Sequence, residues 1–111
     1  MRAAVAFTLL ALTASPALAL SCYEDLGNTG CPAKEVFPLN DLRALSCQNL
    51  WYVRNGVYND HGYCFKTTRA QAEFDNSDCT VDDPSDLGFN SKEQKNIDNI
   101  RRVEKEKGCP K

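Results

Sequence analysis

Two patterns are missing from this 111-residue chain, and each absence argues against a class of metal site. The six cysteines include no Cys-x-x-Cys pair, and His61 is the only histidine. Structural zinc sites need closely spaced thiolates or imidazoles, so cysteine-bound zinc is not expected. The acids between residues 75 and 86 lack the order, central glycine and closing glutamate of an EF-hand loop. The sequence therefore predicts no metal and no cofactor.

The chain also lacks an apolar run long enough to span a membrane. The stretch from Ala3 to Leu12 is too short to cross about 30 Å of hydrocarbon. Arg2 before it and Ala17-Leu18-Ala19 after it are typical of a signal peptide. We therefore expect residues 1–19 to be a signal peptide, no transmembrane segment after cleavage, and a periplasmic or extracellular location. A membrane anchor and a lipoprotein modified at Cys22 remain alternatives, although the latter would leave an odd number of cysteines.

What is present after residue 19 is a small domain rich in cysteine. The mature chain would have 92 residues and a net charge of −3, because only Arg2 is lost from a chain of net charge −2. Six cysteines in an exported chain of this size predict three disulfides. We expect Cys22–Cys31 because these two cysteines bracket one loop, and Cys47–Cys109 and Cys64–Cys79 because of the expected packing of the helices. Six cysteines allow about fifteen connectivities, so the other pairings stay open.

Local patterns predict a mainly α fold of three to four helices with an irregular N-terminal loop. Residues 20–39 show no helical period and form a disulfide-closed segment, and residues 40–111 form the helical domain. Helices are expected over residues 40–45, 47–60, 69–74 and 92–107. The expected N-caps are Asn40, Ser46, Thr67 or Thr68, and Ser91, the last in a capping box with Gln94. Gly62 and Gly108 are expected to end the two long helices, and Gly56 is a tolerated helix-interior glycine at a cost of about 1 kcal/mol.

The second expected helix carries a recognisable tract of residues. Arg54-Asn55 is followed by Tyr58-Asn-Asp-His-Gly62 and then by Tyr63-x-Phe65. This tract resembles the YARHG domain, a family of exported bacterial domains, over roughly residues 40–109. The chain departs from the family pattern at Asn59 and Asp60, where alanine and arginine are usual. The resemblance implies an exported, mostly helical domain and no established activity, and it places the motif on Arg54, Asn55, Tyr58, His61, Gly62 and Phe65.

Chemistry at the motif has two interpretations. His61 is the one candidate catalytic residue, as a general base beside Asp60. Neighbouring helical side chains point about 100° apart, however, so Asp60 is poorly placed to orient it. We therefore expect a structural His61, hydrogen-bonded to the backbone and packed by Tyr58 and Phe65. Arg54 is expected to pair with an internal acid or carbonyl, and Trp51 and Tyr52 to lie in the core and at its edge.

The expected function is that of an exported, non-catalytic interaction module of the bacterial cell envelope, with a protein or a glycan as partner. Nucleic-acid binding is not expected, because the domain is acidic and its basic residues at 101–107 alternate with glutamates. Two alternatives remain, a small secreted hydrolase centred on His61 and a secreted inhibitor or toxin-like protein. A hydrolase predicts a carboxylate from another segment beside His61, whereas a binding module predicts a buried His61 and an exposed aromatic or apolar patch.

Overall fold

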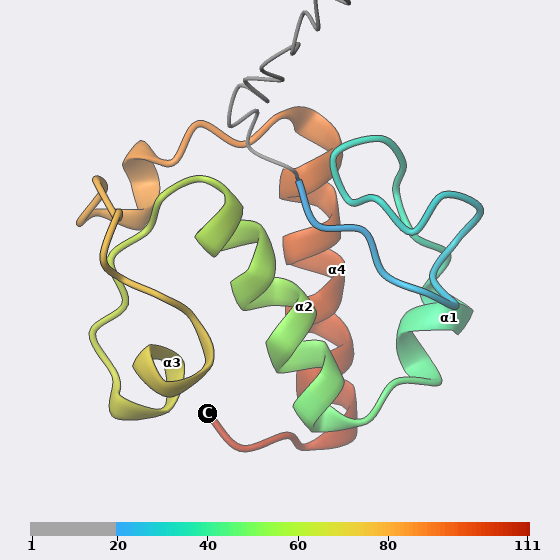
Figure 1. Cartoon of the computed structure of the whole chain (residues 1–111). Coiled ribbons are helices and arrows are strands. Elements are labelled where there is room, and N and C mark those ends of the chain that lie inside the picture. The colour runs from blue at the N-terminus through green and yellow to red at the C-terminus, as the bar shows by residue number, and fades with distance from the viewer. Residues whose placement is uncertain (1–19) are drawn as a thin grey trace, which may run out of the picture.

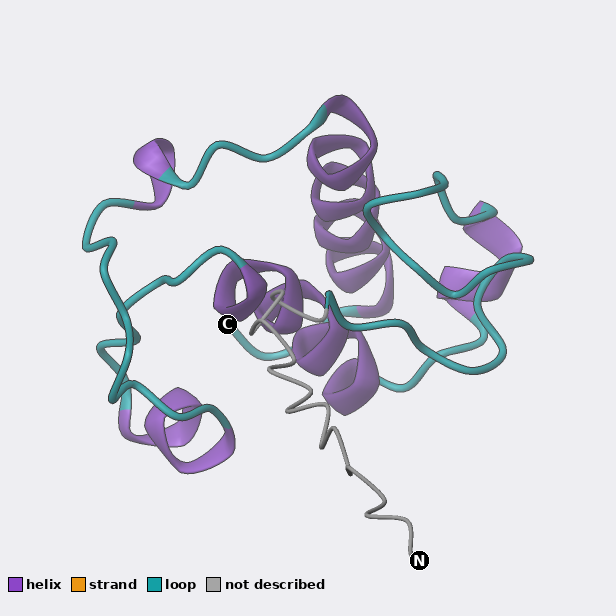
Figure 2. Cartoon of the chain, turned by 45° about the horizontal axis from the view of Figure 1, so that its top comes forward, coloured by secondary structure: helices purple, strands orange, loops and turns teal. Residues whose placement is uncertain are grey.

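Two antiparallel helices, α2 (Cys47–Asp60) and α4 (Ser91–Lys107), form the centre of the computed structural model, which describes residues 20–111 (Figure 1). The N-terminal segment and α1 (Leu39–Arg43) lie on one side of this pair. The helix α3 (Thr68–Glu73) and the 3₁₀ helix η1 (Pro84–Asp86) lie on the other (Figure 2). Between residues 20 and 111 the sole β pairing is a bridge between Tyr63 and Val81. The predicted mainly α class is therefore confirmed, whereas the predicted signal peptide lies outside the described residues.

Several predicted helix ends are confirmed by the backbone. The side chain of Ser46 accepts a hydrogen bond from the Asn49 amide at the start of α2, and Thr67 caps α3 in the same way. The helix α2 ends at Asp60, and Gly62 follows with a φ of 82°. Gly108 ends α4 with a φ of 69°. Left-handed backbone of this kind is readily adopted by glycine, which explains why these two positions were predictable.

Two predicted caps were wrong. Pro38 precedes α1, which begins at Leu39, so Asn40 lies inside the helix and makes no side-chain cap. Proline suits a helix entry because its φ is already fixed and it has no N–H to satisfy. At α4 the capping box consists of Asn90 and Glu93 and not of Ser91 and Gln94. Asparagine and serine cap about equally well, and the charged glutamate is the stronger acceptor, so spacing alone did not choose the pair.

Two apolar clusters pack on α2, one along its first half and the other along its second half. Ile97, Ile100 and Val103 of α4 are fully buried, as their spacing predicted. The first cluster joins α2 and α4 to α1 and the N-terminal segment, and the second joins them to α3 and to the residues around it. The first contains Leu26, Phe37, Leu42, Leu50, Val53, Ile100 and Val103, and the second contains Val57, Tyr58, Phe65, Ala70, Phe74, Leu87 and Ile97. The helices α2 and α4 are therefore the two elements on which both halves of the core pack.

Three disulfides close the fold, and they are the three pairs suggested by the sequence. Cys22–Cys31 closes the N-terminal loop, and Cys64–Cys79 joins the two segments that flank α3. Cys47–Cys109 joins the first residue of α2 to the chain just after α4. None of the cysteines in residues 20–111 is free.

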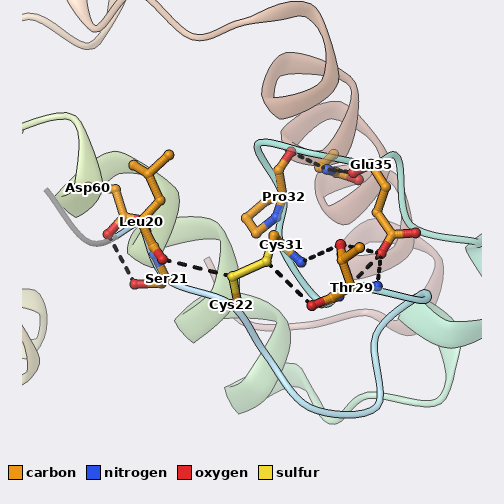
Figure 3. The surroundings of a disulfide bond; sticks show 10 residues. Leu20, Ser21, Cys22, Thr29, Cys31, Pro32, Glu35 and Asp60 are labelled. Carbon is orange, nitrogen blue, oxygen red and sulfur yellow. Dashed lines mark hydrogen bonds between the residues drawn. A yellow bond between two sulfur atoms is a disulfide. The ribbon is translucent and has the colours of Figure 1, made fainter. Parts of the chain in front are cut away.

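The N-terminal loop is held by carboxylate and amide side chains (Figure 3). The carboxylate of Glu35 accepts hydrogen bonds from Thr29 and from the backbone amides of Asn28 and Gly30. These bonds, that of the Thr29 hydroxyl foremost, lower the pKa of Glu35 to about 2. The fully buried Asn96 of α4 accepts from the Phe37 amide at 2.8 Å and donates to the carbonyl of Pro32 at 3.0 Å. One buried amide therefore fixes the path of the chain into α1.

The first residues of this segment lie directly against α2. The amide and hydroxyl of Ser21 donate to the Asp60 carboxylate at 2.9 and 3.0 Å, as Figure 3 shows. Burial raises the pKa of Asp60, and the hydrogen bonds from Ser21 oppose that shift. The phenol of Tyr23 lies against the backbone of α2 at Gly56, where an added Cβ would lie 2.0 Å from the Tyr23 oxygen. Gly56 is therefore a close-approach position, which its place in the sequence did not reveal.

The packing of Tyr23 predicts a measurable effect of alkaline pH. Burial raises the pKa of Tyr23 from 10.0 to about 12, because the phenolate would lose its hydration. The folded pKa exceeds the unfolded one, so the stabilising contribution of the neutral phenol is complete below pH 10 and is lost as the pH rises through about 12. A titration followed by tyrosinate absorbance should therefore contain one late step that is missing in Tyr23→Phe. A Tyr23→Phe protein with an unchanged titration above pH 10 would contradict this account.

Candidate functional site

The motif residues fall into two groups along α2. Arg54, Asn55 and Tyr58 lie on the helix, and together with Phe65 they line one groove. His61 and Gly62 lie at the end of the helix and line a different pocket. The tract that the sequence presents as one motif is therefore divided between two sites.

The groove has two adjoining parts, one along α2 and one at the end of α4. Its first part has a volume of about 350 Å³, and Arg101 of α4 lines it together with the motif residues. Its second part has a volume of about 700 Å³ and is formed by the end of α4 and the residues up to Lys111. Arg54 and Arg101 line both parts, so the two adjoin at these side chains. We call this combined feature the α2 groove.

Arg54 is tied to an internal acid, as the sequence predicted. Its Nε and Nη2 atoms donate to the two carboxylate oxygens of Glu104 at 2.8 and 3.1 Å. The two side chains are only 19% and 13% exposed. Such a two-pronged bond is among the stronger polar contacts in proteins, so it fixes α2 against α4 where the two parts of the groove meet. The amide of Asn55 donates back to the Trp51 carbonyl at 2.9 Å and is buried.

Tyr58 connects the motif to a residue that sequence reasoning missed. A guanidinium N–H of Arg101 donates to the Tyr58 hydroxyl, and the guanidinium carbon lies 5.9 Å from the Tyr58 ring centroid. Arg101 is exposed, whereas Tyr58 is buried. The signal that could have identified Arg101 is its position one helical turn after Ile97 and one turn before Glu104, on the stripe of α4 that faces α2. Arg101 is therefore an exposed cation in direct contact with a motif residue.

The two aromatic residues at the start of α2 differ in exposure. Tyr52 is 40% exposed and stacks on Phe74 with ring centroids 5.4 Å apart. Trp51 is half-buried, and the guanidinium of Arg69 lies 3.9 Å from its ring centroid. Trp51 is therefore packed against the second core cluster with one face covered, and Tyr52 lies exposed where it stacks on Phe74 of that cluster.

His61 has a different partner from the one predicted. Its Nε2 lies 2.7 Å from a carboxylate oxygen of Glu93, and its ring meets Phe89 edge to face at a centroid distance of 5.0 Å. The expected backbone partner and the expected packing by Tyr58 and Phe65 were wrong, because the start of α4 covers this end of α2. The side chain of Glu93 is 4% exposed, and its other oxygen accepts from the Asn90 amide within the capping box. The His61–Glu93 pair therefore fastens the end of α2 to the beginning of α4.

The pocket beside His61 is acidic. It has a volume of about 580 Å³, and its lining includes Asp60, Asp75 and Asp78. Asp60 is occupied by Ser21 and does not orient His61. Cys79 also lines the pocket, but it is bonded to Cys64 and offers no thiolate. The pocket thus contains a histidine paired with a carboxylate, but no thiol nucleophile.

Neither a metal-binding cluster nor a membrane-spanning helix occurs in the described part of the chain. Among residues 20–111 no group of three or more histidine, cysteine, aspartate or glutamate side chains is arranged to hold a metal ion. None of the helices over the same residues is both long and apolar enough to cross a bilayer.

Comparison with known proteins gives one match. The family model of the YARHG domain matches residues 33–105, which is more than half of the chain. No curated protein and no solved structure matches the chain. The matched range begins within the N-terminal segment and covers α1, α2, α3 and all but the last two residues of α4. It contains the His61–Glu93 pair and the residues of the α2 groove up to Lys105.

Proposed function

Because the chain belongs to the YARHG domain family, whose members are of the exported type and have no assigned activity, we propose that it is a binding module of the bacterial cell envelope that acts through the α2 groove. The three disulfides support this proposal, since such bonds persist in oxidising compartments. A periplasmic or extracellular location forms part of the proposal.

One observation carries the proposal. Three motif residues of α2 and Phe65 line a single groove, and the exposed guanidinium of Arg101 lies beside them. Ligand sites in proteins are commonly concave, with apolar and aromatic walls and a few polar groups. The α2 groove has this composition, because the half-buried rings of Trp51 and Tyr63 supply aromatic surface and Arg54 and Arg101 supply charge.

The test compares two substitutions that change the same charge on the same helix. Arg101 lines the groove, whereas Arg102 points toward Glu106 and does not line it. The immobilised disulfide-bonded domain should retain an envelope component as the wild type and as Arg102→Glu, and should lose it as Arg101→Glu. Equal retention by the two variants, with thermal midpoints close to the wild type, would refute binding through the groove.

A secreted hydrolase is the second candidate, and the His61–Glu93 contact favours it. A histidine paired with a carboxylate from another segment is one component of general acid–base catalysis. Against this, Glu93 is buried, and its second oxygen is committed to the capping box of α4. We therefore assign the pair to holding the two long helices together.

This assignment predicts that His61→Ala destabilises the domain. A buried carboxylate that loses its partner costs about 1–3 kcal/mol, and denaturant unfolding should show a loss in this range. His61→Gln keeps a side-chain donor and should lose less. Both variants should retain the envelope component at temperatures well below their midpoints. Loss of function in His61→Ala at an unchanged unfolding midpoint would instead favour the hydrolase.

A further inference from the structure

We infer that the occupant of the α2 groove is an acidic peptide segment, a stretch rich in aspartate and glutamate carried by a partner protein. The inference depends on the proposed function, because it names the ligand class for the same groove. It follows from the charge of the groove, from the burial of its aromatic rings and from its shape.

The charge of the groove is opposite to that of the chain. The chain has a formal net charge of −2, but the groove is lined by five cationic side chains and one acidic one, Glu104. Charge of one sign in a concave surface attracts ligands of the other sign and raises their association rate. The cationic residues are Arg54, Lys66, Arg101, Lys105 and Lys111.

Three of these cations are available to a ligand. Arg54 is paired with Glu104, and Lys66 contacts Asp82 on the surface. Over residues 20–111, by contrast, Arg101, Lys105 and Lys111 belong to no salt bridge. Arg101 still has unused guanidinium donors after its bond to Tyr58, and a guanidinium matches the geometry of a carboxylate. The groove therefore offers unpaired positive charge where its two parts meet.

The rings in the groove favour a peptide over a glycan. A sugar is usually held by stacking on an open aromatic face. The guanidinium of Arg69 covers Trp51 at 3.9 Å. Tyr58 is only 7% exposed and is enclosed by Tyr63, Phe89 and Arg101. The exposed Tyr52 does not line the groove. The rings therefore line the groove but do not offer an open face on which a sugar could stack.

The shape of the groove suits an extended chain. Its two parts share Arg54 and Arg101 and together run from the middle of α2 to the residues after α4. An extended peptide places successive side chains on opposite sides. Every second residue can then direct a carboxylate toward Arg101 or Lys105 while the others face solvent.

The experiment measures binding of a fluorescein-labelled oligoglutamate peptide to the disulfide-bonded domain by anisotropy at low ionic strength. Arg101→Glu should weaken binding by about tenfold or more, whereas Arg102→Glu should leave it close to the wild type. Lys105→Glu and its control Lys95→Glu form a second matched pair, because Lys105 lines the groove and Lys95 does not. Added salt should weaken binding to the wild type.

Three outcomes would overturn the inference. The first is the absence of oligoglutamate binding, and the second is an equal loss of binding for the two variants of each matched pair. The third is tighter binding of an oligogalacturonate of the same charge, which would make the ligand an acidic glycan. If any of these occurs while envelope retention still distinguishes Arg101→Glu from Arg102→Glu, only the acidic-peptide inference fails. If retention no longer distinguishes these two variants, the proposed function fails as well.

Discussion

Removing the Cys47–Cys109 disulfide by a double substitution to alanine is expected to lower the free energy of unfolding by about 4 kcal/mol. The bond closes a loop with a sequence separation of 62. Its loss therefore raises the conformational entropy of the unfolded chain more than the loss of either other bridge. It also joins the start of α2 to the end of α4, the two helices on which both core clusters are built. A domain of this size is stable by roughly 5–15 kcal/mol, so the variant should be marginal at physiological temperature.

The matched control is the double substitution of Cys22 and Cys31. Their separation is only 9, and the same argument predicts a loss of about 2.5 kcal/mol. Urea unfolding of both variants and the wild type gives the comparison directly. A loss at Cys22–Cys31 equal to or larger than that at Cys47–Cys109 would show that the N-terminal loop, and not the helix pair, dominates stability.

Gly56→Ala is expected to destabilise the domain although alanine is the better helix former. The intrinsic gain from replacing a helix-interior glycine is about 1 kcal/mol. Opposing it, the new methyl group would lie 2.0 Å from the Tyr23 phenol oxygen, a distance that forces the two segments apart. Overpacking of this kind costs about 1–3 kcal/mol, so the net effect is a loss of stability. Chemical denaturation of the single variant measures it.

The double-mutant cycle with Tyr23→Phe isolates the cause. Without the hydroxyl, the nearest atom of the ring to the new methyl group is Cζ at 3.3 Å, a tight but tolerable contact. In the Tyr23→Phe background, Gly56→Ala should therefore be neutral or slightly stabilising, and the cycle should show a large interaction energy. Equal destabilisation in both backgrounds would mean that contact with the Tyr23 hydroxyl is not what excludes a larger side chain at residue 56.

Local features of the fold were predictable because each depends on a few neighbouring residues. Ser46, Gly62 and Gly108 mark helix ends through side-chain capping or left-handed backbone. The buried stripe of α4 follows from its period. The capping box at Asn90 was missed by one residue, because several capping residues adjoin one another there.

Features that join distant segments were not predictable from the sequence. Periodicity indicates that a residue faces inward but does not say what it meets. The contact of His61 with Glu93 spans 32 residues, and that of Asn96 with the Phe37 amide spans 59. Gly56 was interpreted as a tolerated glycine because nothing near it in sequence indicates the approach of Tyr23. The motif identified Arg54 and Tyr58, whereas Arg101 belongs to the groove only through tertiary packing.

The structure explains why this chain departs from the family pattern at Asp60. Asp60 occupies the position where the pattern has arginine, and it accepts two hydrogen bonds from Ser21. Ser21 precedes the matched range of residues 33–105. The aspartate therefore serves contacts with a segment outside the family match, and an arginine there would leave the Ser21 donors without their acceptor.

The central claim is that the α2 groove binds a ligand and that the His61 end of α2 is structural. Backbone amide shift mapping tests it most directly, with the isotope-labelled domain titrated with the envelope fraction that it retains. The account predicts that the perturbed amides concentrate at residues 51–58, 63–67 and 101–111. Perturbations concentrated at residues 59–62 and 75–80, around the pocket of His61, would contradict it.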